Sequence, residues 1–234
     1  MRIQKYLSEQ GVLSRREAEK YIQEGRIKLN GSVVREMGVQ MDPEKDLIEV
    51  TGLDLHERKV RKMTVVVYKP RGVTSSKNRA EGKTVFETFP KFKDLNAVGR
   101  LDKESEGLLL LSNDGVITAA VTGENHSVEK EYEVTVREEV RNWHLEKMTS
   151  GIMLDGKKTK KAKAELRSPH TFRIILTEGR THQIRRMADA VHLTIQKLTR
   201  IRIHTITIAS LRGEKSRTLT EKEVLDFKKI RRTQ

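Results

Sequence analysis

The fold of most of this 234-residue chain is decided by one stretch, Gly99-Arg100-Leu101-Asp102-Lys103-Glu104-Ser105-Glu106-Gly107-Leu108-Leu109-Leu110-Leu111-Ser112-Asn113-Asp114-Gly115. Its four consecutive leucines, bounded by glycines, predict a strand that is buried on both faces, as in the middle of a sheet. The polar loop before the leucines carries Asp102, and loops that rigid elements hold in place often bear functional side chains. Read alone, an aspartate in a loop is usually a turn former, so the pattern makes Asp102 only a candidate.

Segments on both sides of this strand predict further strands and helices. The apolar and β-branched runs favour strands at 64–69, 107–112, 131–136, 171–177 and 201–209. Apolar residues at helical spacing predict a helix over 182–192, with Ile184, Met187, Ala188 and Val191 on its inner face, and a last helix covers 221–230. The pattern indicates an α+β fold with a central mixed sheet over residues 63–234.

The first 50 residues predict a separate helix–helix–hairpin unit. Ser14 and Glu17 form a capping box that opens the second helix. Asn30-Gly31, placed between apolar residues, is a strong hairpin signal. The unit resembles the S4 RNA-binding domain, and residues 51–62 read as a linker to the second domain. In that family the start of the second helix and the following turn face RNA, which implicates Arg15, Arg16, Lys20, Arg26 and Lys28.

The composition points to a nucleic-acid partner. The net charge is +14 and the pI is about 9.9, and a pI above about 9 is expected of a domain that binds nucleic acid. Residues 1–60 are neutral overall, so the whole surplus lies in residues 61–234. The sequence shows no basic helix with a broad apolar face, no apolar segment of membrane-spanning length and no signal peptide. There are no cysteines. These features predict a cytoplasmic protein that does not bind membranes.

Five ordered motifs identify the larger domain as similar to the pseudouridine synthases of the RsuA family, which often carry an N-terminal S4 domain. Besides the Asp102 stretch, the motifs are Lys69-Pro70-x-Gly72, Lys130-Glu131-Tyr132, the run from Glu178 to Met187, and Leu198-x-Arg200-x-x-Ile203. The resemblance covers nearly the whole chain. It implies an enzyme that isomerises uridine to pseudouridine in ribosomal RNA.

One thinner likeness concerns the substrate. Gly151-Ile152 followed by Thr159 to Lys163 is similar to the branch that modifies 23S ribosomal RNA, the synthase F type. The segment 157–167 holds six basic residues and one acidic residue, so it is either a solvated loop or a rail for phosphates that includes Lys160 and Lys161. We expect 23S ribosomal RNA as the partner, leave transfer RNA open as a second substrate, and expect a monomer.

The chemistry assigns roles to single residues. The isomerisation gains no atoms and involves no redox change, so we expect neither cofactor nor metal. The resemblance makes Asp102 the essential carboxylate, acting either as a nucleophile at C1′ or as a general base on the ribose. The resemblance implies that Tyr132 stacks on the base and helps in proton transfer at C5. The alternative is a core residue on the face of Val134 and Val136, and the two roles are compatible. On an ideal helix Arg185 lies at the flank of the inner face and Arg186 points outward, so we expect Arg185 to pair with Asp102 and Arg186 to contact phosphate. An irregular start of this helix would exchange the two roles.

The remaining residues have supporting roles. Leu198 and Ile203 are expected as apolar pocket walls, and Arg100 and Lys103 as residues that hold phosphate or orient the Asp102 loop. The main alternative is a non-catalytic S4-type RNA-binding protein, which would leave the acidic motif of the second domain unexplained. A nuclease would need converging carboxylates for metal or a pair of histidines, and the sequence shows no such set.

Overall fold

The computed structural model describes residues 1–53, 62–123 and 128–232. These residues form two compact units: residues 1–63 together with 114–116, and residues 64–113 together with 117–234. The predicted linker at 51–62 falls largely outside the described residues, because only 51–53 and 62 are described. Residues 1–63 are called the N-terminal unit below, and the second set the sheet unit.

The N-terminal unit has the predicted helix–helix–hairpin order. Helix α1 (Ile3–Glu9) is followed by α2 (Arg15–Gln23), and strands β1 (Ile27–Leu29), β2 (Ser32–Val34) and β3 (Ile48–Val50) form an antiparallel sheet in the order β2-β1-β3. The capping box is present, since the Glu17 amide donates to Ser14 Oγ and the Ser14 amide donates to Glu17 Oε2. Asn30 and Gly31 both have positive φ, as the tight turn of a two-residue hairpin requires.

The sheet unit is built on one large mixed sheet. Its strand order is β10-β11-β7-β12-β6-β4-β14, with β5 paired to β6 and β13 paired to β12. The bounds are β4 (Thr64–Lys69), β5 (Asn96–Val98), β6 (Glu106–Ser112), β7 (Lys130–Val136), β10 (Lys163–Ser168), β11 (Thr171–Leu176), β12 (Ile195–Ile203), β13 (Ile206–Thr207) and β14 (Ser216–Thr218). All pairs are antiparallel except β6 with β12. A short separate hairpin joins β8 (Met153–Leu154) to β9 (Lys157–Lys158).

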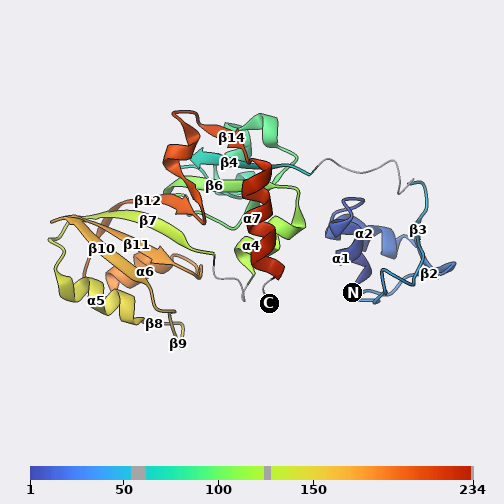
Figure 1. The fold of residues 1–234 in the computed structure, drawn as a ribbon, viewed down its shortest axis with the longest axis horizontal. Helices are drawn as coiled ribbons and strands as arrows, with labels where there is room; N and C mark the ends of the chain where they lie inside the picture. The colour runs from blue at the N-terminus through green and yellow to red at the C-terminus, as the bar shows by residue number, and fades with distance from the viewer. Residues whose placement is uncertain (54–61, 124–127, 233–234) are drawn as a thin grey trace. The chain divides into compact units, whose positions relative to one another are not determined.

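Helices cover both faces of this sheet (Figure 1). Helices α5 (Asn142–Ser150) and α6 (Gln183–Asp189) pack with Val134 and Leu198 in one core. Helices α4 (Gly115–Thr122) and α7 (Glu221–Arg232) pack with Leu108 and Leu110 in a second. The short helix α3 (Val85–Thr88) packs on Leu109 and its neighbours in a third. The 3-10 turns are η1 (Arg79–Glu81), η2 (Pro90–Phe92) and η3 (Ile208–Leu211).

The leucine run is buried on both sides, as predicted. Leu108 to Leu111 are all 0% exposed, and alternate leucines face the second and third cores. Two element predictions need correction. The strand expected at 201–209 begins earlier, as β12 at Ile195, because its partner β7 pairs with it from Ile195 to Ile203. The helix expected over 182–192 is the shorter α6.

Candidate functional site

Asp102 lies on a loop that the rest of the unit holds in a defined conformation. The Ser75 hydroxyl donates to the Leu101 carbonyl at 2.8 Å and accepts from the Leu101 amide at 3.0 Å. The Gly72 amide donates to the Lys103 carbonyl at 2.7 Å. The Asp102 side chain is 30% exposed. The carboxylate is therefore held in place and remains open to a substrate.

The partner of Asp102 differs from the prediction. His182 Nε2 lies 3.6 Å from Asp102 Oδ1. Arg185 instead donates to the Glu104 carbonyl at 3.0 Å and to Ser105 Oγ at 3.3 Å. The expected ion pair of Arg185 with Asp102 is thus wrong for this geometry, because the long side chain reaches the backbone of the loop rather than its carboxylate. Arg185 positions the loop that carries Asp102.

One row of paired residues crosses the sheet beside this loop. Lys69 on β4 pairs with Gly107 on β6, Gly107 pairs with Arg200 on β12, and Arg200 pairs with Tyr132 on β7. Paired residues of neighbouring strands point to the same face of a sheet. Gly107 has no side chain, and a Cβ there would lie 2.4 Å from the Arg200 carbonyl oxygen. Lys69, Arg200 and Tyr132 therefore share one face, with close backbone contact between β6 and β12.

Arg200 is a buried cation at the centre of this row. Its side chain donates from Nε to the Leu108 carbonyl at 2.7 Å and from Nη1 to the Arg100 carbonyl at 3.3 Å. Nη1 also lies 3.5 Å from the Tyr132 hydroxyl. The residue is 3% exposed, and its Nη2 is buried without a hydrogen-bond partner. Such a group is costly to bury, so a charged side chain at this position needs an explanation from the chemistry of the site.

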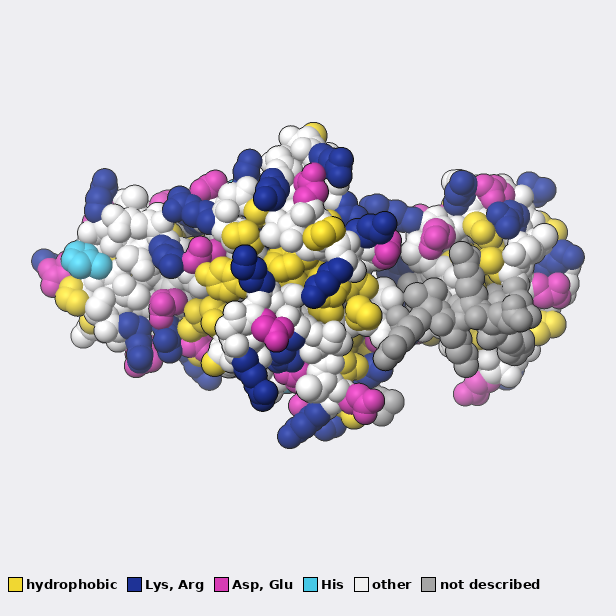
Figure 2. Space-filling model, turned by 90° about the horizontal axis from the view of Figure 1, so that it is seen from above, with side chains coloured by type: hydrophobic (Ala, Val, Ile, Leu, Met, Phe, Trp, Pro, Cys, Tyr) yellow, Lys and Arg dark blue, Asp and Glu magenta, His cyan; other side chains and the backbone are white. Residues whose placement is uncertain are grey.

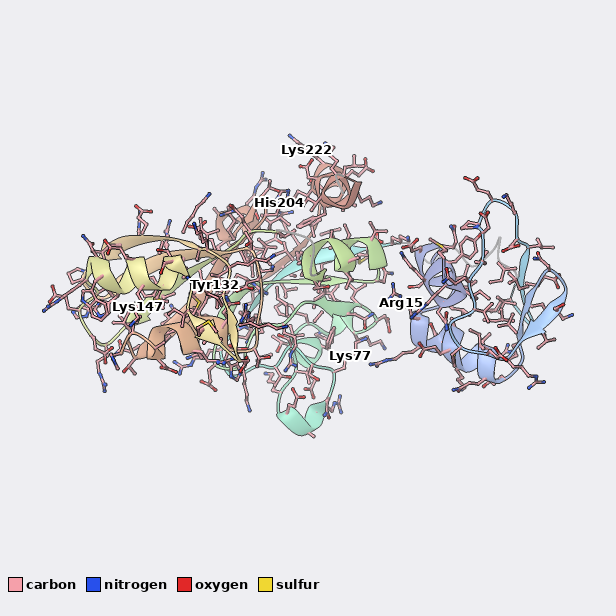
Figure 3. The ribbon with its side chains drawn as sticks, turned by 90° about the horizontal axis from the view of Figure 1, so that it is seen from below. Arg15, Lys77, Tyr132, Lys147, His204 and Lys222 are labelled. Carbon is pink, nitrogen blue, oxygen red and sulfur yellow. The ribbon has the colours of Figure 1, made fainter. Side chains whose placement is uncertain are left out.

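Two lysines lie near Arg200. Lys69 is 0% exposed and donates to the Pro70 and Val73 carbonyls at 2.9 and 2.7 Å. Burial, followed by the Arg200 charge, lowers the pKa of Lys69 to about 8. Lys130 precedes Tyr132 by two residues on β7, so it faces the same side. Burial and then the Arg200 charge lower its pKa to about 8 as well. Figure 3 shows Tyr132 within the sheet unit.

The basic residues predicted in the N-terminal unit lie at or near its surface. Arg15, Arg16 and Lys20 are exposed, and Arg26 and Lys28 are half-buried. The Arg26 guanidinium lies 3.9 Å from the centroid of the Tyr21 ring, and its Nη2 donates to the Thr51 carbonyl. This unit also has a cavity of about 640 Å³, lined by Arg2, Gln4, Lys5, Arg15, Glu19, Met37 and Gly38.

Of the basic residues predicted in the sheet unit, four are exposed: Arg100, Lys103, Lys160 and Lys161. Arg186 is not a free phosphate ligand, because both its terminal nitrogens pair with Asp155 at 2.8 Å. Arg180 donates to the Leu154, Lys157 and Lys158 carbonyls. These two arginines therefore hold the β8–β9 hairpin against the segment that leads into α6. Figure 2 shows Lys and Arg side chains over the visible face of this unit.

The two predicted pocket walls lie in different cores. Leu198 is 4% exposed and packs with α5 and α6, whereas Ile203 is 1% exposed and packs with α4 and α7. They do not form one wall together. Among the described residues, no cluster of His, Cys, Asp and Glu fits a metal, and no helix is long and apolar enough to cross a membrane.

Four residues of the site had no role in the sequence prediction, although the motifs contained them: His182, Lys69, Lys130 and Arg200. A signal was present for Arg200, because it stands directly before the strand expected at 201–209, where an arginine is rarely buried unless it is paired or functional. Its burial depends on the neighbouring strands β6 and β7, which the sequence does not place. His182, which contacts Asp102, lies 80 positions later in the chain.

Known proteins share this architecture. Residues 63–190 match the RNA pseudouridylate synthase family, and residues 1–45 match the S4 domain. The dual-specificity RNA pseudouridine synthase RluF of Escherichia coli strain K12 is 33% identical over 98% of this chain and 79% of its own length. The ribosomal large subunit pseudouridine synthase B of Bacillus subtilis is 36% identical over 95% of this chain and 93% of its own. A crystal structure of a pseudouridylate synthase, 29% identical, covers 97% of this chain and 99% of its own with a TM-score of 0.69.

Proposed function

This chain belongs to the RNA pseudouridylate synthase family, and we propose that it isomerises one uridine of 23S ribosomal RNA with Asp102 as the essential carboxylate. The family and its relatives make the protein a pseudouridine synthase of ribosomal RNA. The choice of 23S RNA rests on two observations. The Bacillus subtilis relative is named for the large ribosomal subunit, and residues 151–163 are similar to the branch that modifies 23S RNA. The arrangement around Asp102 supports the role of that residue.

One observation carries the assignment of Asp102. It is a half-buried carboxylate, on a loop held by Ser75 and Gly72, beside a sheet face that bears Tyr132 and a buried arginine. The base must leave its stack to bring C1′ to this carboxylate, as in other enzymes that act on a base. Asp102 then attacks C1′ as a nucleophile or removes a proton from the ribose as a general base. His182, 3.6 Å away, is placed to support the carboxylate.

RNA binding is divided between the two units in this proposal. The exposed cations Arg15, Arg16 and Lys20 contact phosphates, with Arg26 and Lys28 beside them. Phosphate contacts release counterions, so this part of the affinity falls as salt rises. In the sheet unit Arg100, Lys103, Lys160 and Lys161 have the same role. We propose a cytoplasmic monomer, and we propose transfer RNA as a second substrate to be tested because the Escherichia coli relative is named dual-specificity.

The test compares wild type with Asp102→Asn on unmodified 23S, 16S and transfer RNA. Asparagine keeps the shape of the side chain but cannot act as a carboxylate. We expect pseudouridine in 23S RNA from wild type, and RNA binding without product from the variant. Product in 16S RNA alone would refute the 23S assignment and keep the chemistry. An active Asp102→Asn variant would refute the role of Asp102.

A second candidate, a non-catalytic S4-type RNA-binding protein, has a separate signature. It predicts tight RNA binding by wild type and variant alike with no product on any of the three RNAs. The family match over residues 63–190 and the held Asp102 loop speak against it.

A further inference from the structure

The sheet face beside Asp102 carries more positive than negative charge. Lys69 and Arg200 lie on this face, as the strand pairing shows. Lys130 lies two residues before Tyr132 on β7 and so points to the same side. The loop presents Asp102 there. Glu104 on the same loop is exposed and pairs with Arg71 at 3.1 Å. Glu106 is next to Gly107 in sequence and therefore faces the other side, where it accepts from Tyr68 at 2.9 Å and pairs with Lys197 at 3.1 Å. Within the described residues no carboxylate forms an ion pair with Arg200.

The buried cations on this face also have hydrogen-bond donors that are not used. Arg200 Nη2 is buried without a partner, and a guanidinium nitrogen of this kind offers two N–H groups. Lys69 donates to two carbonyls, which leaves one of its three N–H groups. A buried cation with unused donors is unfavourable unless a ligand or a reaction intermediate supplies the missing negative charge.

The burial of Arg200 and Lys69 determines which part of the RNA can contact them. Arg200 is 3% exposed and Lys69 is 0% exposed. The sugar–phosphate backbone follows the protein surface, where exposed lysines and arginines are available to it. A uridine turned out of its stack enters the site with its base first. The base, rather than a phosphate, is therefore the part that approaches the floor of the site.

The reaction produces negative charge on that base. When the N1–C1′ bond breaks, its electron pair leaves with N1, and C1′ is stabilised by a bond from Asp102 or by loss of a ribose proton that is later returned. The detached uracil then holds a negative charge spread over N1, O2 and O4. After the base turns, C5 donates an electron pair to C1′, the C5 proton leaves and N1 gains a proton. Atoms and electrons balance, because the product is an isomer of the substrate.

We propose that Arg200, with the ammonium groups of Lys69 and Lys130, stabilises the negative charge of the detached uracil between these two bond changes. This role rests on the proposed site around Asp102 and deepens it. Groups that are already oriented in a water-poor site stabilise developing charge strongly, because they need no reorganisation during the reaction. Tyr132, whose hydroxyl is 3.5 Å from Arg200 Nη1, holds the base above these donors.

Loss of Arg200 should change the single-turnover rate and the RNA Kd differently. Negative charge on the uracil exists only after the RNA is bound. Loss of a residue that stabilises this charge therefore affects the chemical step alone. We expect Arg200→Gln to lower the single-turnover rate by roughly 10² to 10³, as loss of an oxyanion-stabilising donor does, while the RNA Kd stays unchanged. An increase in Kd that matches the loss of activity would assign Arg200 to RNA binding and overturn the proposal.

A substrate with a better leaving base gives the readout that a structural role would not change. Fluorine at C5 withdraws electrons, so detached 5-fluorouracil is the more stable anion. Under single turnover, consumption of the N-linked nucleoside is followed by chromatography after digestion. The Arg200→Gln defect should be at least about fivefold smaller for 5-fluorouridine than for uridine, because the missing charge stabilisation matters less. Equal defects on both substrates would refute the proposal.

Two further variants complete the test. If Arg200→Gln fails to fold, Lys130→Gln replaces it, because that residue is half-buried and accepts replacement more readily; its rate should fall by roughly tenfold with the same dependence on the substrate. Lys222→Gln removes one charge from α7, where Lys222 projects into solvent (Figure 3), and should leave both rate and Kd unchanged. An Arg200 variant that is as fast as an active wild type would refute the role of Arg200 and leave the proposed function standing. An inactive wild type on every ribosomal RNA would refute the proposed function.

Discussion

Gly107→Ala tests the junction between the two halves of the central sheet. In the described sheet β6 and β12 join these halves in parallel through two residue pairs, Thr199 with Glu106 and Arg200 with Gly107. A Cβ at Gly107 would lie 2.4 Å from the Arg200 carbonyl oxygen and 2.7 Å from its amide nitrogen. Both are backbone atoms, so neither can turn away. The strands must separate, which moves Arg200, together with its partner Tyr132 on β7, away from β6 and from the loop that carries Asp102.

The expected cost has two parts. Gly107 has a φ of +109°, which costs a non-glycine residue on the order of 1–3 kcal/mol. Relief of the backbone clash adds roughly 1–3 kcal/mol, as overpacking does. We expect the free energy of unfolding to fall by about 4 kcal/mol, near the middle of the combined range. At roughly 2–4 °C per kcal/mol for a domain of this size, Tm falls by about 8–16 °C.

The fluorescence of the single tryptophan reports the unfolding of the sheet unit, because Trp143 lies on α5. Gly213→Ala is the matched control: φ there is +84° and a Cβ would meet nothing within 4 Å, so only the conformational cost of about 1–2 kcal/mol remains. If Gly107→Ala loses no more stability than Gly213→Ala and keeps wild-type activity, the close approach of β6 and β12 does not constrain the site as we describe.

Four other predictions concern the site and the RNA contacts. Because burial lowers the pKa of Lys130 to about 8, its positive charge is lost as pH rises above 8; activity should decline there, and Lys130→Arg should extend part of the activity to higher pH in a pH–rate profile. His182→Ala removes the side chain next to Asp102 and should lower the single-turnover rate by roughly 10- to 100-fold; a rate equal to wild type would show that the contact has no catalytic effect. Asp155→Asn breaks the pair with Arg186 and should weaken RNA binding in filter assays without changing the rate at saturating RNA, since the β8–β9 hairpin loses its attachment. Deletion of residues 1–55 should raise Kd far more than it lowers the saturated rate, and equal binding by the truncated protein would contradict a binding role for the N-terminal unit.

Local sequence determined much of this protein. Four leucines in a row specify a strand buried on both faces wherever a sheet accepts them, and Leu108 to Leu111 are buried as predicted. The capping box of Ser14 and the Asn30-Gly31 turn depend on neighbours within three residues. The stretch around Asp102 made that residue a candidate by its pattern, and its resemblance to the pseudouridine synthases implied the chemistry, because a motif records residue types and their order. In each case the information lies within a short segment.

Tertiary structure decided the partners. The start of β12 at Ile195 follows from pairing with β7, which the residues of β12 alone do not reveal. A helical wheel placed Arg185 on the correct flank of α6 but could not show that its side chain ends on the Glu104 carbonyl, or that His182 reaches Asp102. Arg200 is surrounded because β6 and β7 lie on either side of it. These contacts join residues far apart in the chain, and their positions depend on how the strands pack, so no local pattern encodes them.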